Sequence, residues 1–143
     1  MAMDWNAFNE WNKSVIEEFH ATGGKPGGQF EGAKILLLTT TGAKSGQRRI
    51  SPLVYLPYND SCVIFASKGG TPTHPDWYHN LVANPQVTVE VGTETFEATA
   101  TIATGELRDQ LYAEQVKVAP QFGEYQAKTT RQIPVIILER RAV

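Results

Sequence analysis

Residues 35–49 read Ile-Leu-Leu-Leu-Thr-Thr-Thr-Gly-Ala-Lys-Ser-Gly-Gln-Arg-Arg. An apolar run that ends in threonines is typical of a buried strand, and the two glycines bound a basic loop. Residues 32–75 hold five basic side chains and one acidic side chain, whereas the whole chain of 143 residues has a net charge of −2. Cations beside hydroxyls and backbone N–H groups suit a phosphorylated or polycarboxylate ligand. The stretch therefore predicts a strand that leads into an anion-binding loop.

The rest of the chain alternates strand and helix signals without a regular repeat. Strands are predicted where β-branched or aromatic residues lie between Gly, Asn, Asp or Pro, at residues 33–40, 49–56, 62–67, 86–91, 95–102 and 135–138. The segments 58–61 and 91–94 read as hairpin turns. Helices are predicted from about Asp4 to His20, from Pro75 to about Asn84, and after Thr104, where Leu107, Leu111 and Val118 share a face. This order favours an α+β fold, an antiparallel barrel or curved sheet with attached helices, over a doubly wound sheet.

The length fits one domain with a sizeable core. We divide the chain into residues 1–28, an amphipathic helix and a Gly-rich connection, and residues 29–143, the barrel. Cys62 lies in an apolar run and reads as a small buried hydrophobe. The N-terminal sequence lacks an export signal, so we expect a cytoplasmic protein. Trp5, Phe8 and Trp11 either pack on the barrel or rest weakly on a membrane surface.

Several familiar catalytic patterns are missing. The Gly42–Gly46 loop has neither the phosphate-loop spacing nor the hydrolase elbow. His74 and His79 are five residues apart and lack accompanying metal ligands, so we expect no metal site. The pI near 5.9 argues against a nucleic-acid binder. An enzyme without acid–base machinery is typical of cofactor chemistry, in which the protein supplies orientation and electrostatics.

Three spaced motifs carry a specific resemblance. They are the Leu-Leu-Thr-Thr-Thr-Gly-x-Lys-Ser-Gly-Gln-x-Arg stretch, Ser67-Lys68-Gly69-Gly70, and Pro75-Asp76-Trp77-Tyr78-His79-Asn80-Leu81 with Ala83-Asn84-Pro85. In this order they resemble the deazaflavin-dependent nitroreductase family, over residues 35–138. The resemblance implies a split β-barrel like that of FMN-binding proteins, with flanking helices. It also implies the cofactor 8-hydroxy-5-deazaflavin, coenzyme F420, whose phosphate and oligoglutamate tail are anionic.

The resemblance also implies where the cofactor would lie. The loop would flank the phosphate and tail, the next strand would pass under the ring system, the motif at Ser67 would form the opposite wall, and the helix start at Asp76 would present N–H groups and aromatic surface. The residues so assigned are Ala43, Lys44, Ser45, Arg49, Ile50, Ser51, Pro52, Leu53, Val54, Phe65, Ala66, Ser67, Lys68, Asp76, Trp77, Tyr78, His79 and Asn80.

The expected substrate is an electron-poor small molecule such as an activated alkene, a quinone or a nitro compound. Phe122 and Tyr125 are assigned to its pocket, and Tyr125 is our candidate proton donor. The family's nitroreductases often carry tyrosines where this chain has Ala119 and Phe122, so Tyr125 is the retained phenol. Alternatives are an FMN-binding oxidoreductase on the same barrel and a non-catalytic carrier of the coenzyme or a lipid-like ligand. The oligomeric state is left open between monomer and homodimer.

Overall fold

A computed structural model of the chain describes residues 5–24 and 34–141, with side chains from residue 12 onward. Its helices are α1 (Trp5–Ala21), α2 (Asp76–Ala83), α3 (Gly105–Val118) and α4 (Gln121–Ala127), with a short 3-10 turn, η2 (Lys68–Gly70). Its strands are β1 (Ile35–Thr41), β2 (Arg48–Val54), β3 (Leu56–Tyr58), β4 (Ser61–Phe65), β5 (Gln86–Val91), β6 (Glu94–Ala103) and β7 (Val135–Arg140).

All seven strands form one antiparallel sheet in the order β2-β1-β5-β6-β7-β4-β3. β2 and β3 follow each other in the sequence but lie at opposite edges of the sheet, and β2 contacts β4. The sheet is therefore curled, as a split barrel is. Pro52 and Pro57 lie in the two edge strands, where a residue without a backbone N–H interrupts no ladder. The predicted α+β split barrel is confirmed.

Three strands are buried on both faces, which explains their continuous apolar sequences. Along β7, Ile136 and Leu138 face the barrel interior with Trp77 and Leu81 of α2, while Val135 and Ile137 face the core under α3 and α4. β4 alternates between the same two cores. On β1, the residues that face away from the barrel interior pack against Phe19 of α1.

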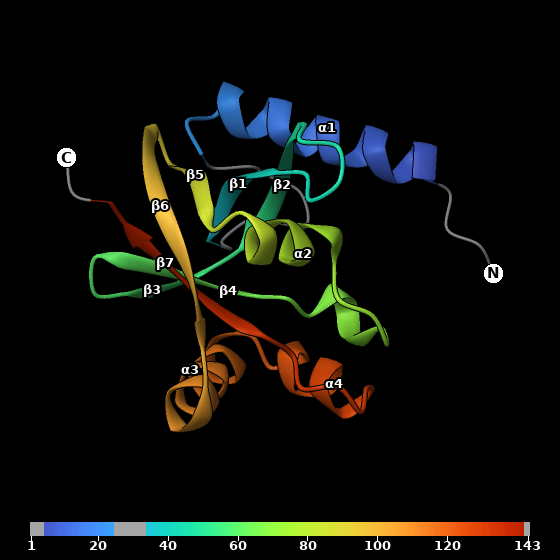
Figure 1. The fold of residues 1–143 in the computed structure, drawn as a ribbon, viewed down its shortest axis with the longest axis vertical. Coiled ribbons are helices and arrows are strands. Elements are labelled where there is room, and N and C mark those ends of the chain that lie inside the picture. Colours follow the sequence, from blue (N-terminus) through green and yellow to red (C-terminus); the bar gives the residue numbers. More distant parts are fainter. Residues whose placement is uncertain (1–4, 25–33, 142–143) are drawn as a thin grey trace.

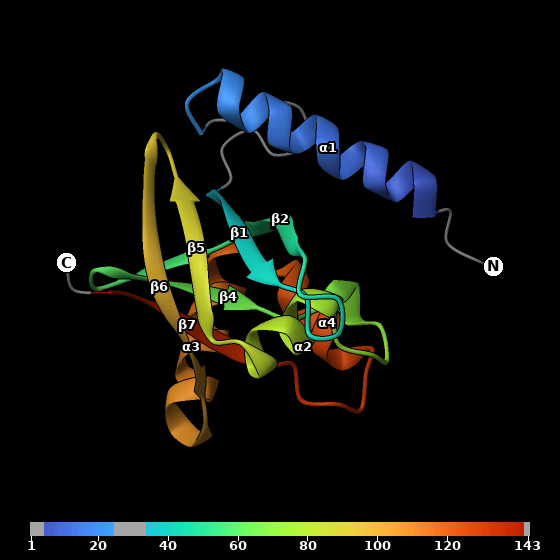
Figure 2. The same cartoon turned by 45° about the horizontal axis from the view of Figure 1, so that its top comes forward.

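The helices cover different parts of the sheet (Figures 1 and 2). α1 crosses the β1–β2 side, and in both views its N-terminal end extends beyond the sheet. In Figure 1, α3 and α4 lie at the opposite end of the molecule, and α2 lies between them and α1. Within residues 5–24 and 34–141, no helix is long and apolar enough to cross a membrane.

Many predicted elements are confirmed. β5 has the predicted bounds, and the two hairpins close through the pairs Tyr58↔Ser61 and Val91↔Glu94. In α1, Val15 and Phe19 are buried as the helical pattern predicts, and Cys62 is buried. The placement of Trp5, Phe8 and Trp11, the Asp4 cap and the Gly-rich connection at residues 25–28 fall outside the residues or side chains that the structure describes.

Two predictions were wrong. Residues 49–56 form not one strand but parts of β2 and β3, because the chain leaves one edge of the sheet at Tyr55 and enters the other. The face of α3 was also misplaced: Leu107 is 38% exposed and Val118 is 72% exposed, while Arg108, Leu111, Tyr112 and Gln115 are buried. Because the polar residues Arg108 and Gln115 lie on the buried face of α3, the apolar spacing of that face cannot be recognised in the sequence. α4 and η2 were not predicted.

Candidate cofactor site

The β1–β2 loop is held in place by a side chain of α2. Asn80 Oδ1 accepts a hydrogen bond from the Ala43 backbone N–H at 3.0 Å, and Asn80 Nδ2 donates to Thr40 Oγ1 at 3.2 Å. Within the loop, Ser45 Oγ accepts from the Gln47 N–H at 3.1 Å. Asn80 and Ser45, both predicted to contact the cofactor, are thus the residues that shape the loop.

The basic side chains of the site differ in what they already bind. Arg48 Nη2 donates to Thr88 Oγ1 at 2.9 Å, and Arg49 Nη2 donates to Gln47 Oε1 at 3.2 Å. Lys44 is exposed and forms no hydrogen bond or ion pair with another described residue. None of these cations is paired with a carboxylate among the described residues. The loop therefore keeps its positive charge uncompensated.

The β2 edge offers apolar surface next to these cations. Ile50 is 41% exposed, and residues 51–54 are half-buried. Because β2 is the first strand of the sheet order, its outer N–H and C=O groups have no strand partner. An exposed apolar side chain on an open edge suits the face of a ring system whose polar atoms need backbone partners.

The predicted opposite wall is mostly core. Phe65 is 5% exposed, and its ring packs edge to face on Tyr112 and Phe122 at centroid distances of 5.8 and 5.7 Å. Ala66 is fully buried and Ser67 is 9% exposed. Lys68 is exposed, with φ at +46°, and its Nζ is 3.4 Å from Thr73 Oγ1. A ligand would therefore meet mainly the turn at Lys68, while Phe65 and Ala66 support it from behind.

The residues predicted to bind the cofactor at the start of α2 differ in how exposed they are. Trp77 is 9% exposed and packs in the barrel core with Leu81, so it is the core anchor of this helix. Asp76 and His79 are exposed and Tyr78 is half-buried. The rings of Tyr78 and His79 lie 5.7 Å apart, and His74 lies 4.7 Å from Tyr78. The accessible part of this helix start is thus a group of polar aromatic rings.

Phe122 and Tyr125 lie on α4, beside η2. Their rings meet at 5.1 Å, with Phe122 buried and Tyr125 half-buried. A Cβ atom on Gly70, whose φ is +82°, would lie 2.6 Å from the Tyr125 carbonyl oxygen. The Tyr125 hydroxyl has no hydrogen-bond partner among the described residues. This close approach brings the predicted substrate residues next to the turn that carries Lys68.

Two arginines that organise this region were not predicted from any sequence pattern. Arg108, buried on α3, donates to the Ile133 carbonyl at 2.8 Å and to Gln126 Oε1 at 2.7 Å. Gln126 Nε2 in turn donates to the Arg131 carbonyl at 2.8 Å. The Arg131 guanidinium reaches the segment at Ser67 and His74. Only the fold brings residues 108, 126 and 131 together, so no local pattern reveals them.

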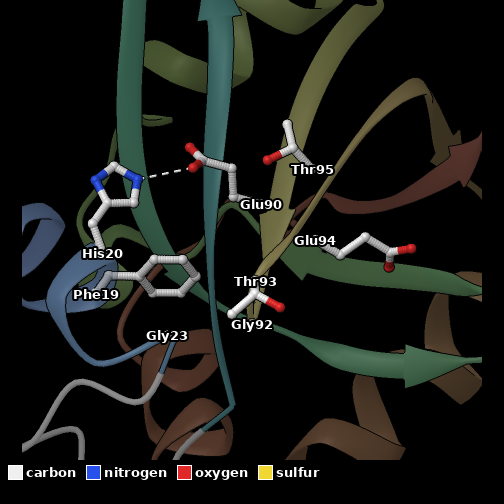
Figure 3. Close-up of a pocket in the computed structure, with 8 residues that line it drawn as sticks. All are labelled: Phe19, His20, Gly23, Glu90, Gly92, Thr93, Glu94 and Thr95. Carbon is white, nitrogen blue, oxygen red and sulfur yellow. Dashed lines mark hydrogen bonds and ion pairs between the residues drawn. The ribbon is translucent and has the colours of Figure 1, made fainter.

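Two cavities lie away from the predicted residues. One, of about 240 Å³, is formed by the end of α1 and the β5–β6 hairpin, where His20 Nε2 and Glu90 Oε1 are 2.8 Å apart (Figure 3). The other, of about 400 Å³, lies between β3 and α3, where Leu56, Tyr58 and Leu111 contribute to its lining. Neither is lined by a residue assigned to the cofactor.

The donor set of the predicted surface fits a phosphorylated cofactor with a planar ring system. Cations that have no carboxylate partner among the described residues would suit anionic oxygens, and the open apolar edge of β2 would suit the ring. The hydrogen bond from the Ala43 N–H to Asn80 joins the β1–β2 loop to α2, and η2 lies in the segment that leads into the same helix.

The chain is similar in sequence and in fold to known proteins. Residues 11–140 match the family model of the F420H(2)-dependent quinone reductases. An F420H(2)-dependent quinone reductase of Mycobacterium tuberculosis (strain H37Rv) is 42% identical over 129 residues, which are 86% of this chain and 85% of that protein. A solved F420-H2-dependent reductase, FDR-A, is 46% identical, covers 74% of this chain and 94% of its own, and has a TM-score of 0.69.

A further solved structure, a domain-swapped dimer, is 40% identical and has a TM-score of 0.72, with 92% of this chain and 98% of that chain covered. The family model spans nearly all strands and helices described above, and the quinone reductase relative exceeds 40% identity over most of both chains. The chain belongs to the F420H(2)-dependent quinone reductase family.

Proposed function

We propose that the surface around α2 binds reduced coenzyme F420 and that the protein uses it to reduce quinones and related electron-poor molecules. The family supplies the cofactor and the reaction class, a reduction by F420H2. One observation carries the assignment to this surface: Lys44 lies in the loop that Asn80 of α2 holds, the exposed Lys68 lies in the turn that precedes α2, and Ile50 lies on the open edge strand that follows the loop.

Each part of the surface has a separate task. Lys44 and Arg49 attract the anionic tail, and Ser67 with Lys68 binds the phosphate through charge-assisted hydrogen bonds. Residues 50–54 lie under the ring system and exclude water from it. When bound, the reduced coenzyme supplies a hydride, which the substrate accepts.

Tyr125 would complete the reaction by donating a proton to the reduced substrate. Its hydroxyl is free among the described residues, and its ring is fixed against Phe122. A positioned proton donor contributes to the rate, whereas a phenyl ring in its place keeps the packing and loses the proton. Tyr125→Phe with unchanged turnover and an unchanged melting temperature would exclude this role.

Coenzyme binding tests the assignment directly. The protein is titrated with oxidised F420 and, in parallel, with FMN, with fluorescence as the readout. Lys68→Ala should weaken F420 binding by about 1.5–3 kcal/mol, because one charge-assisted contact is lost. Lys117→Ala is the matched control, since Lys117 is exposed on α3 and pairs there with Glu114. Equal dissociation constants for both variants would remove Lys68 from the site.

Turnover separates an enzyme from a carrier. Reduced F420 is mixed with the protein and a panel of quinones and enones, and its oxidation is followed with time. Acceptor-dependent oxidation supports the reductase, whereas tight binding without oxidation would indicate a carrier. A preference for FMN in the titration would contradict the proposed cofactor assignment.

We also infer a homodimer in which α1 packs against a partner's barrel. A relative at 40% identity is a domain-swapped dimer. In this chain α1 contacts the sheet through Val15, Phe19 and the His20–Glu90 pair. The N-terminal end of the helix extends beyond the sheet (Figure 2). Light scattering after size exclusion tests this, and a monomer at all concentrations would refute it.

A further inference from the structure

Arg131 is placed between the two segments assigned to the coenzyme. It lies in the connection between α4 and β7, and its side chain is half-buried. Its Nε donates to the Thr71 carbonyl at 2.9 Å, Nη1 donates to the Ala66 carbonyl at 3.0 Å, and Nη2 donates to the Ser67 carbonyl at 2.7 Å. Nη1 also lies 2.9 Å from His74 Nδ1. These four contacts use four of the five guanidinium N–H groups, so Arg131 acts on the protein itself.

The Arg131 guanidinium binds the backbone on both sides of Lys68. It binds the carbonyl of Ser67 immediately before Lys68 and the carbonyl of Thr71 three residues after it. Lys68 has a φ of +46°, a left-handed conformation that costs free energy for any residue with a Cβ atom. A non-glycine residue persists in this conformation when its surroundings over-determine it. Arg131 supplies those restraints from outside the turn.

The same guanidinium fixes the state of His74. Arginine has only N–H donors, so His74 Nδ1 must accept, and the ring proton must then reside on Nε2. Burial lowers the pKa of His74, and the charges of Arg131 and His79 lower it further, which favours the neutral imidazole. His74 lies 4.7 Å from the Tyr78 ring and 5.9 Å from the His79 ring, and its Nε2 has no hydrogen-bond partner among the described residues.

We propose that Arg131 is a positioning residue for coenzyme binding, which holds Lys68 in its left-handed turn and fixes His74 as a neutral imidazole whose Nε2–H donates to an oxygen of the bound coenzyme. The inference rests on the proposed function of the surface around α2. It adds to that function a ligand-directed hydrogen bond from His74 and a residue that acts only through others. A neutral Nε2–H suits a phosphate or ring carbonyl oxygen, since both are acceptors.

Nitrogen NMR of the ligand-free protein tests the first half. With ¹⁵N-labelled histidine, the Nδ1 and Nε2 shifts report the tautomer, and His20→Gln and His79→Gln identify the signals of His74. We expect His74 to be neutral with its proton on Nε2 at pH 7, and Arg131→Gln to abolish that preference. Arg141→Gln removes a positive charge from an exposed arginine just after β7 and should leave the His74 signals unchanged. A wild-type His74 with its proton on Nδ1 would overturn the inference.

Titration with oxidised F420 tests the second half. Arg131→Gln should raise the dissociation constant about tenfold, the scale of one lost charge-assisted contact. Arg131→Lys keeps the charge, but its single ammonium group cannot reproduce the hydrogen bonds of the guanidinium to three carbonyl groups. This variant should therefore bind F420 more weakly as well. His74→Gln retains a side-chain N–H donor and should bind more tightly than His74→Phe, which has none. Far-UV circular dichroism checks that each variant is folded.

The outcomes separate this inference from the proposed function. F420 binding of equal affinity by the wild type and a folded Arg131→Lys would overturn the inference and leave the cofactor site in place. Equal affinities of His74→Gln and His74→Phe would overturn the donor role of His74. Absence of F420 binding by the wild type would overturn the proposed function together with the coenzyme-directed role, while the NMR result would still decide whether Arg131 fixes His74.

Discussion

Replacing Asn80 by alanine should destabilise the protein by about 2–3 kcal/mol, because two hydrogen bonds are lost at sites of different burial. The Thr40 hydroxyl, in a residue with no exposed surface, loses its Asn80 partner, at a cost of about 1.5–2 kcal/mol, which is the middle of the range for a buried polar group left without a partner. The Ala43 N–H is exposed, so water replaces part of its bond, at a cost of about 0.5–1 kcal/mol. For a domain of 143 residues this corresponds to a fall in melting temperature of about 6–10 °C.

A double-mutant cycle makes this magnitude testable. Thr40→Val removes the hydroxyl that Asn80→Ala orphans, so the double variant should be about 1 kcal/mol more stable than the sum of the two single effects predicts. Asn80→Asp is the matched control, since its carboxylate can accept from both Ala43 and the Thr40 hydroxyl. Urea unfolding followed by circular dichroism gives each free energy. Strictly additive effects, or a melting temperature of Asn80→Ala within about 2 °C of the wild type, would refute the reasoning.

Three further predictions concern other parts of the fold. Gly70→Ala should destabilise the protein more than Gly46→Ala in thermal unfolding, because both glycines have a positive φ but only Gly70 lies against Tyr125. An equal fall in melting temperature for the two variants would contradict that contact. Arg108→Met should cost about 3 kcal/mol, because the buried Ile133 carbonyl loses its side-chain donor and Gln126 Oε1 keeps only the Ile133 N–H. Arg140→Met breaks an exposed pair with Glu94 and should cost under about 1 kcal/mol. Finally, His74 faces Arg131, His79 and Tyr78, and its pKa is lowered in the folded protein. The unfolded chain therefore binds more protons, so the free energy of unfolding should fall as the pH drops below about 6.5. Urea titrations at several pH values should show a weaker pH dependence for His74→Gln.

Local sequence patterns predicted most of the fold because most of its strands and turns depend on residues that are close together in the sequence. β5 and both hairpins follow from β-branched residues and turn residues that act over a few positions. The strand predicted at residues 49–56 fails at Tyr55 because the break depends on where the two halves pair, and β2 and β3 pair with different neighbours. The face of α3 fails because buried Arg108 and Gln115 take positions that the pattern assigns to apolar residues.

The residues of the candidate site also differ in whether a local sequence pattern could predict them. Lys44 and Lys68 were assigned to the cofactor because they stand in motifs of consecutive residues, and the structure shows that both are exposed. Arg131 was missed because its partners, Ala66, Ser67 and Thr71, are about 60 residues away in the sequence. Trp77 shows the opposite problem, since a motif residue that reads as ligand surface is buried in the barrel core. A sequence motif identifies the segment that forms a site but not the direction of each side chain.

The position of β7 in the sheet sets an order for folding. β7 is the last described strand in the sequence but lies between β6 and β4, and it pairs Leu138 with Cys62, which is 76 residues earlier in the chain. Until residues 135–140 have been synthesised, β4 and β6 each expose a central edge, and the two halves of the sheet cannot join. Such distant pairing makes folding slow and leaves open edges that invite aggregation. The edges of β4 and β6 are therefore covered only once β7 has paired between them, which makes this pairing the step that closes the sheet.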